Sequence, residues 1–261
     1  MIGTRSLRYL NALAADDPAL GAIRAGAPLA TGLAMVGLAA VARSRPMGVA
    51  LLALASWAAW FFRDPPRVCP GEPDTVYAAA DGVVTAVDEV EWDWFIYGRA
   101  LRIVTFLSLV DVHVNRSPVA GRLVASRRDP GSFAPAFLVG GSANNARQLL
   151  GIEAEFEVRR STIEARHDRL RTSNLEPRTA PGRHRVVVAQ VAGFLARRIV
   201  SWRLPGDAVA AGQKLGMIRF GSRTDVLVPA GVAEPLVSPG TRVRAGLTPI
   251  ARYRAEATVR F

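Results

Sequence analysis

The chain has 261 residues, half of them apolar, a formal net charge of +11 and one cysteine, Cys69. This length and composition exclude a disordered or fibrous protein, and the lone cysteine excludes an internal disulfide and a cysteine-based zinc cluster. The charge, carried almost wholly by arginine, points to an anionic partner, either nucleic acid or an acidic lipid surface, although a GC-rich genome also favours arginine. No recognition-helix, RNP-like or zinc pattern accompanies the arginines, so the sequence favours lipid and no nucleic-acid partner. A reducing compartment is the simplest setting for one cysteine.

Two uncharged apolar runs lie near the N-terminus, at about 26–42 and 46–62. Each has about 17 residues, which is the lower limit for crossing a bilayer. We interpret residues 1–69 as a membrane-associated region in which two apolar helices form a hairpin that spans or only enters the membrane. A buried hairpin in a soluble core has the same pattern. More arginines flank the runs than lie between them, which favours both flanks on the cytoplasmic face of the cell membrane.

From residue 70 the sequence changes to short segments rich in valine and isoleucine, separated by glycine and proline. This pattern predicts a mainly β (α+β) domain over 70–261. The motif Pro-Gly-x-x-Val-x-Ala-Gly occurs twice in it, after Leu204 and after Ser238. It is similar to the half-repeat of biotinyl and lipoyl carrier domains, and predicts a β-sandwich or hammerhead-like fold. Lys214 lies within the turn of the repeat and not at an exposed hairpin tip, so we interpret the repeat as architecture and leave a carrier as the alternative.

His113 is the histidine with the most informative surroundings. It follows an apolar segment in FLSLVDVHVNRSPVAG, where period-two spacing places Asp111, His113 and Asn115 on one face of a strand. That face could simply be exposed to solvent. His167 and His184 lie in arginine-rich sequence without a pattern, and we expect both at the surface.

Two further polar sites have an ordinary interpretation as turns. Asp81 precedes a glycine in AAADGVV, as in many Asp-Gly turns. Gly221 and Ser222 lie between two β-like runs in IRFGSRTDVLVP. Neither site indicates chemistry by itself.

Five segments in order nevertheless make the chain resemble the short, membrane-associated, pyruvoyl-dependent branch of the phosphatidylserine decarboxylase family. They are FFRDPPR (61–67), ADGVV (80–84), FLSLVDVHVNRSPVAG (106–121), VVVAQVAGFLARRIV (186–200) and GQKLGMIRFGSRTDVLVPAG (212–231). Together they cover most of the chain after residue 60, apart from one internal block.

The resemblance implies that the chain is a zymogen that cleaves itself between Gly221 and Ser222. The Ser222 hydroxyl would attack the preceding carbonyl to give an ester, and β-elimination would leave a covalent pyruvoyl group at the new N-terminus. Glycine reduces steric bulk beside this carbonyl, and serine needs a base. His113 matches the family histidine for base or proton transfer, and Asp81 the aspartate that orients it. The products would be a β chain (1–221) and an α chain (222–261).

The activity that the resemblance implies is decarboxylation of phosphatidylserine to phosphatidylethanolamine and CO2 in phospholipid biosynthesis. The substrate amine would form a Schiff base with the pyruvoyl group, which accepts the electrons released with CO2. His113 would protonate the resulting carbanion, and no metal or diffusible cofactor is expected. The expected partners are phosphatidylserine, anionic membrane lipid, the two chains of the precursor and further copies of the protein.

Two departures from the family pattern bear on this expectation. Longer members have a second histidine where this chain has Arg116, so His113 would serve both self-processing and proton transfer. The block at about 139–183 lacks the usual Asn-Glu-Arg segment and has only NLEPR at 174–178 in its place. It is predicted to be a surface insertion or a local helix with an unstructured tail. The alternative function is an inactive relative or a membrane-anchored, carrier-like adaptor in which Ser222 stays intact.

Overall fold

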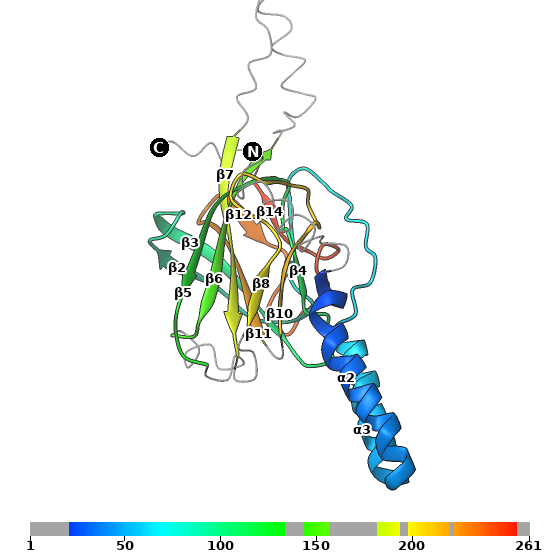
Figure 1. Ribbon diagram of the computed structural model, residues 1–261. Coiled ribbons are helices and arrows are strands. Elements are labelled where there is room, and N and C mark those ends of the chain that lie inside the picture. Colours follow the sequence, from blue (N-terminus) through cyan, green and yellow to red (C-terminus); the bar gives the residue numbers. More distant parts are fainter. Residues whose placement is uncertain (1–20, 134–143, 157–181, 194–197, 220–221, 255–261) are drawn as a thin grey trace, which may run out of the picture.

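The computed structural model describes residues 21–133, 144–156, 182–193, 198–219 and 222–254 (Figure 1). Most of the expected insertion at 139–183, including the NLEPR segment and His167, lies outside these residues. Within them a helical hairpin projects from one side of a β-rich body (Figure 1).

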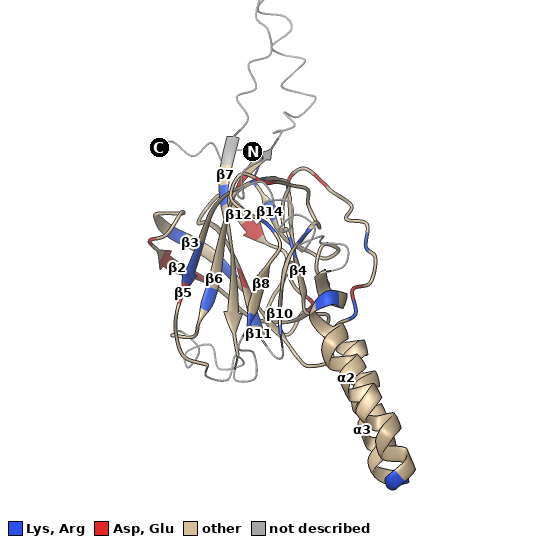
Figure 2. Cartoon of the chain, in the orientation of Figure 1, with Lys and Arg blue, Asp and Glu red and all other residues tan. Residues whose placement is uncertain are grey.

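The hairpin consists of α2 (Gly21–Arg43) and α3 (Arg45–Phe61). Glycines allow the two helices to approach closely, because a Cβ on Gly48 would lie only 2.3 Å from a side-chain carbon of Val41. Arg43 and Arg45 lie at the tip, and the length of the hairpin is otherwise almost without charge (Figure 2). The two helices expected at about 26–42 and 46–62 are confirmed, and the first begins earlier than expected.

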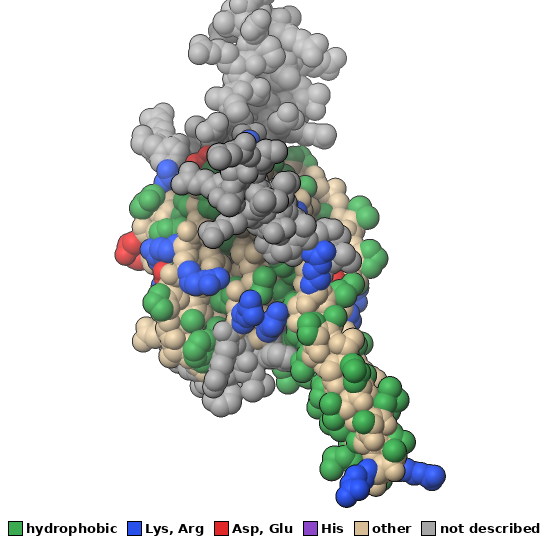
Figure 3. Space-filling model, viewed as in Figure 1, with side chains coloured by type: hydrophobic (Ala, Val, Ile, Leu, Met, Phe, Trp, Pro, Cys, Tyr) green, Lys and Arg blue, Asp and Glu red, His purple; other side chains and the backbone are tan. Residues whose placement is uncertain are grey.

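The outer surface of the hairpin is apolar. Met35 is 71% exposed and Val49 is 62% exposed, and hydrophobic side chains cover much of the projecting hairpin (Figure 3). Of the described helices, α2 is long and apolar enough to cross a membrane, by length and composition. A helix in a soluble core would bury these side chains, so the exposed apolar surface fits membrane association better.

The β-rich body confirms the mainly β fold class. Its strands are β1 (Thr75–Tyr77), β2 (Gly82–Trp92), β3 (Gly98–Leu107), β4 (Val114–Arg116), β5 (Gly121–Asp129), β6 (Arg147–Phe156), β7 (Gly182–Ala192), β8 (Ile199–Ser201), β9 (Ala208–Val209), β10 (Lys214–Ile218), β11 (Ser222–Pro229), β12 (Ala233–Pro235), β13 (Arg242–Val243) and β14 (Pro249–Tyr253). They form an eight-stranded sheet in the order β13-β2-β3-β11-β7-β6-β5-β9 and two three-stranded sheets, β1-β14-β12 and β4-β10-β8. All of these strand pairs are antiparallel.

The alternation of side chains along β11 decides which of its residues face the main core. Val226 and Val228 pack in the largest apolar cluster together with Leu215 of β10 and Ile250 of β14. Leu227 packs in a different cluster, on the other side of the sheet. Because side chains alternate with a period of two, Ser222 and Thr224 lie on the same face as Val226 and Val228. This face, called the inner face below, is the one toward β10 and β14.

The repeated motif forms a short strand, a turn and a second strand on both occasions, β9 to β10 and β13 to β14. Gly212 and Gly246 both have positive φ, 75° and 70°, and a Cβ on Gly246 would lie 2.9 Å from the Cα of Gly212. The two turns therefore pack directly against each other, as expected of an architectural repeat. Lys214 is ion-paired with Asp64 in the body of the protein, which disfavours the carrier alternative.

Candidate active site

Ser222 is the first residue of β11, and it is fully buried on the inner face of the large sheet. Its backbone lies between Leu107 of β3 and Ala192 of β7. Its Oγ makes no hydrogen bond in the described part of the chain. Gly221, the residue expected to precede the cleaved bond, lies outside the described residues. A buried hydroxyl without a partner is costly, by about 1–3 kcal/mol, and a catalytic role is one of the explanations for such an atom.

His113 is fully buried beside the start of β4, so the alternative that its face is simply exposed to solvent is wrong. Its Nδ1 lies 2.9 Å from the carbonyl oxygen of Asp111. A carbonyl oxygen can only accept a hydrogen bond, so Nδ1 carries the proton and Nε2 is the basic nitrogen. Burial lowers the pKa of His113 from 6.5 to about 4, which keeps the ring neutral at physiological pH.

Asp111 does not share a strand with His113 as the period-two spacing predicted. It closes a turn, where its carboxylate accepts hydrogen bonds from the backbone N–H of Ser108 at 2.9 Å and from the Ser108 hydroxyl at 2.6 Å. It is also ion-paired with Arg242 at 2.9 Å. The side chain of Asp111 therefore stabilises the turn, and its backbone carbonyl orients His113.

The base of the helical hairpin covers His113. The ring of Phe61, the last residue of α3, lies 4.3 Å from the imidazole between ring centres, at an interplanar angle of 38°. Phe61 is completely buried in an apolar cluster that joins the hairpin to β4 and β10. The members of this cluster are Ala22, Phe61, Phe62, Val112, Val114, Trp202 and Met217. The apolar hairpin thus supplies the apolar wall that covers His113.

The short segment at β4 holds the chain on both sides of Ser222. Before the serine, the backbone N–H of Ile218 donates to the carbonyl of His113 at 3.3 Å. After it, the amide of Asn115 donates to the hydroxyl of Thr224 at 3.2 Å. Residues 113–115 and the region of Ser222 therefore lie close together, although more than a hundred residues separate them in the sequence.

Gln190 extends this polar contact across the sheet. Its amide nitrogen donates to Oδ1 of Asn115 at 2.7 Å, while its Oε1 makes no hydrogen bond in the described part of the chain. Gln190 pairs with Thr224 in register, so its side chain is also on the inner face near Ser222. Sequence reasoning missed Gln190, because a glutamine in a valine-rich strand carries no signal until its neighbours are known.

Asp81 is buried near this site but is bound to other groups. Arg67 contacts its carboxylate through two hydrogen bonds of 2.5 and 2.7 Å, and the backbone N–H of Ala245 donates to it at 2.8 Å. A direct hydrogen bond between Asp81 and His113 is not present. Asp81 does act on His113 electrostatically, and its negative charge opposes the lowering of the His113 pKa that burial causes.

The charged residues of the FFRDPPR segment form anchors that the sequence did not reveal. Besides the pair of Arg67 with Asp81, Asp64 is ion-paired with Arg116 at 3.0 Å and also with Lys214. Arg116 additionally donates to the carbonyl of Gly212 at 3.1 Å. Arg116, which the resemblance implies in place of a second histidine, thus forms a buried ion pair. One sequence feature could have indicated these anchors: charged residues stand on both sides of the two prolines that follow the apolar helix.

His184 is a second correction. It was expected at the surface but is buried, and its ring stacks on Tyr253 at 4.8 Å with an interplanar angle of 26°. Burial lowers its pKa. Across the described ranges, no group of His, Cys, Asp and Glu side chains has the arrangement of a metal site.

The comparisons with known proteins identify the family of the chain. The family model of phosphatidylserine decarboxylase matches residues 54–251. The chain is 42% identical to the phosphatidylserine decarboxylase proenzyme of Symbiobacterium thermophilum, over 88% of this chain and 94% of that protein. It is 36% identical to the proenzyme of the same name from Carboxydothermus hydrogenoformans, over 80% and 85%. Fold and site therefore define the class of protein: a β-rich enzyme with a buried serine, a neutral buried histidine and an apolar hairpin. The chain belongs to the phosphatidylserine decarboxylase family.

Proposed function

We propose that this chain decarboxylates phosphatidylserine to phosphatidylethanolamine after cleaving itself between Gly221 and Ser222. The observation that carries the proposal is the buried Oγ of Ser222, which has no hydrogen-bond partner among the described residues and begins a strand held on both sides by residues 113–115. The relatives' name of proenzyme supports a processed form. Processing would give a β chain of residues 1–221 and an α chain of residues 222–261.

In the processing reaction, His113 is proposed as the base. The Asp111 carbonyl fixes the proton on Nδ1, so Nε2 can accept the proton of the Ser222 hydroxyl. The hydroxyl oxygen attacks the carbonyl carbon of Gly221, and the peptide bond is replaced by an ester. Loss of the Cα proton of residue 222 expels the ester carboxylate, and hydrolysis then releases ammonia and leaves a pyruvoyl group. Asp81 is proposed to stabilise the positive charge that His113 carries during these steps.

The site suits the prosthetic group because the atom consumed to make it, the Ser222 Oγ, is buried and binds no other described group. When present, a pyruvoyl group supplies a ketone that condenses with the substrate amine and draws off the electrons released with CO2. His113 is proposed to deliver the proton that replaces the carboxylate. Phe61 and the surrounding apolar cluster exclude water from this proton transfer. Asn115 and Gln190 keep Thr224, and with it the start of β11, in place.

The hairpin is proposed to insert α2 and α3 into the cytoplasmic leaflet of the cell membrane. Its base contacts the catalytic histidine directly through Phe61. At the same base, the guanidinium of Arg63 lies 3.7 Å over the ring of Trp60, an aromatic and basic pair of the kind found at membrane interfaces. The substrate amine would therefore be reached from the lipid headgroup layer without the lipid leaving the bilayer.

Intact-mass measurement of the purified full chain tests the proposal. We expect the 28.0 kDa chain to be replaced by two fragments, and the fragment starting at residue 222 to be lighter by one ammonia than a fragment with an N-terminal serine. Ser222→Ala should leave a single intact chain without decarboxylase activity. Ser238→Ala, which removes an exposed hydroxyl from the same small fragment, should process normally. A wild-type chain that stays intact and inactive would establish the alternative, an unprocessed relative.

A further inference from the structure

A short turn, residues 108–111, connects two parts of the candidate active site. It begins directly after Leu107, which pairs in register with Ser222. It ends at Asp111, whose backbone carbonyl oxygen lies 2.9 Å from Nδ1 of His113. A surface that contacts this turn therefore lies at the edge of the site.

The turn presents two apolar side chains to the outside. Its ends are joined by hydrogen bonds, because the backbone N–H of Asp111 donates to the carbonyl of Ser108 at 3.0 Å and the Ser108 hydroxyl donates to the Asp111 carboxylate at 2.6 Å. Leu109 and Val110 occupy the two central positions and are 37% and 56% exposed. Central positions of turns usually carry glycine, proline, asparagine, aspartate or serine, so the local turn chemistry does not explain this apolar pair.

The turn is attached to the base of the helical hairpin. The guanidinium of Arg63 donates to the carbonyl of Val110 at 2.6 Å and to the carbonyl of Trp60 at 3.2 Å. The same guanidinium lies 3.7 Å over the exposed ring of Trp60. Because Arg63 contacts both, the turn lies level with the last residues of α3, and its exposed apolar side chains extend the apolar surface of the hairpin (Figure 3).

The charges beside the turn suit an anionic headgroup layer. Asp111 is ion-paired at 2.9 Å with Arg242, whose own side chain is mostly exposed. Arg63 supplies a second cation at the turn. Exposed apolar side chains with arginines next to them are typical of surfaces that lie at a membrane interface.

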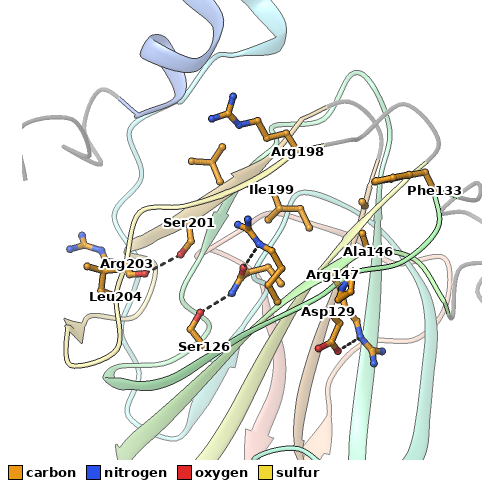
Figure 4. Close-up of a pocket in the computed structure, with 15 residues that line it drawn as sticks. Ser126, Asp129, Phe133, Ala146, Arg147, Arg198, Ile199, Ser201, Arg203 and Leu204 are labelled. Atoms are coloured by element: carbon orange, nitrogen blue, oxygen red, sulfur yellow. Dashed lines mark hydrogen bonds and ion pairs between the residues drawn. The ribbon is translucent and has the colours of Figure 1, made fainter. Parts of the chain in front are cut away.

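A cavity of about 770 Å³ offers a different kind of surface on the β-rich body (Figure 4). It lies between β5, β6 and the segment 198–204, and charged and polar side chains in its lining bind one another. Arg147 is ion-paired with Asp129 at 2.9 Å, and the amide of Gln148 donates to the hydroxyl of Ser126 at 2.7 Å. Burying such groups in hydrocarbon is costly, so the turn suits contact with a bilayer better than this cavity does.

We propose that Leu109 and Val110 insert into the bilayer beside α3 and form one lipid-contacting surface with the hairpin. This inference rests on the proposed function, in which the hairpin enters the membrane. The hairpin alone leaves the body free to rotate about the hairpin axis, whereas a second contact beside it fixes that rotation. The rotation that inserts the turn places the edge of the site, between Leu107 and His113, against the lipid headgroups.

Spin labels on the full-length Ser222→Ala chain test this surface without cleavage or activity. Single cysteines replace Val110, Leu236 or Val36 in a Cys69→Ser background, and the proteins are placed in vesicles of phosphatidylcholine and phosphatidylglycerol. The measured quantity is the ratio of two collision rates of the label, with oxygen, which concentrates in the bilayer, and with a nickel chelate, which stays in water. This ratio should be at least about fivefold higher at position 110 than at position 236.

The other two positions are controls. Leu236 is an exposed apolar residue that directly follows β12, and Val36 is an exposed residue of α2 that reports insertion of the hairpin. Equal ratios at positions 110 and 236 overturn the inference, and a high ratio at position 36 in the same vesicles then shows that the proposed insertion of the hairpin still stands. A high ratio at position 110 supports the surface even if the wild-type chain proves to be unprocessed.

Kinetics of the processed enzyme give a second test. The double variant Leu109→Gln/Val110→Gln adds no charge and should cleave normally. Its KM for phosphatidylserine in vesicles should rise about tenfold, with kcat changed by less than about twofold, while its KM for monomeric dihexanoyl phosphatidylserine should not change. Leu236→Gln should change neither KM. A rise for both substrates would overturn the inference because the turn would then act on the site itself, and a rise for neither would overturn it because the turn would then contact no lipid.

Discussion

Two groups of buried polar side chains lie within one small region, and they differ in the kind of partner that their polar atoms have. In the arginine–aspartate anchors, Arg67 with Asp81 and Arg116 with Asp64, each carboxylate has a cationic partner, although Asp64 Oδ2 and Arg116 Nε make no hydrogen bond in the described residues. The serine cluster consists of Ser222, Thr224, Asn115 and Gln190, and it leaves Ser222 Oγ and Gln190 Oε1 without partners in the described residues. The first group consists of paired opposite charges, which suits a structural role, and the second includes the Ser222 hydroxyl, a potential nucleophile without a partner in the described residues.

The difference follows from the cost of burying polar atoms. Removing one partner of a buried ion pair with good geometry lowers the free energy of unfolding by several kcal/mol, because the remaining charge is left unpaired. A buried hydroxyl without a partner already carries a cost of about 1–3 kcal/mol, so its removal does not weaken the fold. Changes in the two groups should therefore affect stability and activity in opposite ways.

The largest effect on activity is expected at Ser222. Ser222→Ala should abolish both cleavage and decarboxylation, because Ser222 is the cluster residue whose hydroxyl directly follows the Gly221 carbonyl in the chain. Thr224→Val, on the same face two residues away, should slow cleavage only about tenfold, since it removes one hydrogen bond from Asn115. Time courses followed by intact mass would measure both. Cleavage at 222 in the alanine variant would remove Ser222 from the mechanism.

The largest effect on stability is expected at the anchors. Asp81→Ala should lower the free energy of unfolding by about 3–5 kcal/mol, because Arg67 is left buried and unpaired. Denaturant titration would measure this difference. It should be done in the Ser222→Ala background, so that every sample contains one uncleaved chain. Glu89→Gln, which breaks an exposed pair with Arg99, is the matched control and should cost less than about 1 kcal/mol.

A stable Asp81→Ala protein would contradict this role as an anchor. If such a protein also failed to process when Ser222 is restored, Asp81 would belong with the serine cluster, as the family resemblance implies.

The pH dependence of processing sharpens the role of His113. In the proposed reaction the neutral ring is the base, and burial lowers its pKa from 6.5 to about 4. The cleavage rate should therefore hold as pH falls below 6.5 and decline with a midpoint near 4. His113→Gln should slow cleavage by about 10²–10⁴-fold. Rates from intact mass between pH 3.5 and 8 would be compared. A midpoint near 6.5 would show that the histidine is solvated during the reaction.

The same pKa predicts a direction for stability. In the unfolded chain His113 binds a proton near pH 6.5, whereas in the folded chain it does so only near pH 4. The unfolded state therefore binds more protons between these values, and stability falls as pH falls from about 6.5 to about 4. In the Ser222→Ala background, His113→Gln should make this decline shallower. An unchanged slope would assign the decline to other groups.

The smallest effect is expected from Phe61→Leu, which keeps an apolar side chain but removes the ring over His113. Water should reach the imidazole more easily, so the midpoint of the pH profile should move from about 4 toward 6.5. The loss of stability should be about 1 kcal/mol. Phe62→Leu is the matched control, since it changes a ring of the same cluster but leaves the Phe61 ring over His113, and it should move the midpoint less.

Some of these features could be predicted from the sequence because they depend on local pattern. Uncharged runs of about helical length predicted α2 and α3, and valine-rich segments between glycines predicted the strands. The repeated motif predicted the paired turns at Gly212 and Gly246, since both need positive φ. His113 and Ser222 were identified only because their motifs resemble those of a family.

The remaining features could not be read from the chain. Nothing in the local sequence of Asp81 points to Arg67, and nothing near His184 predicts that Tyr253 covers it. In the sequence, Gln190 is only one polar residue in a valine-rich strand. Its hydrogen bond to Asn115 of β4 is visible only in the fold. Each of these facts depends on a contact between residues far apart in the chain.

The sequence by itself therefore determined the hairpin and the mainly β class, because composition and periodicity fix local geometry. Only the tertiary structure decided which of the buried polar residues are anchors and which remain unsatisfied beside Ser222. The physical reason is that desolvation and partner geometry, which set pKa and reactivity, are properties of the assembled core. Arg116 and His113, three residues apart in the sequence, show this directly: one is held by Asp64, and the other lies neutral under Phe61.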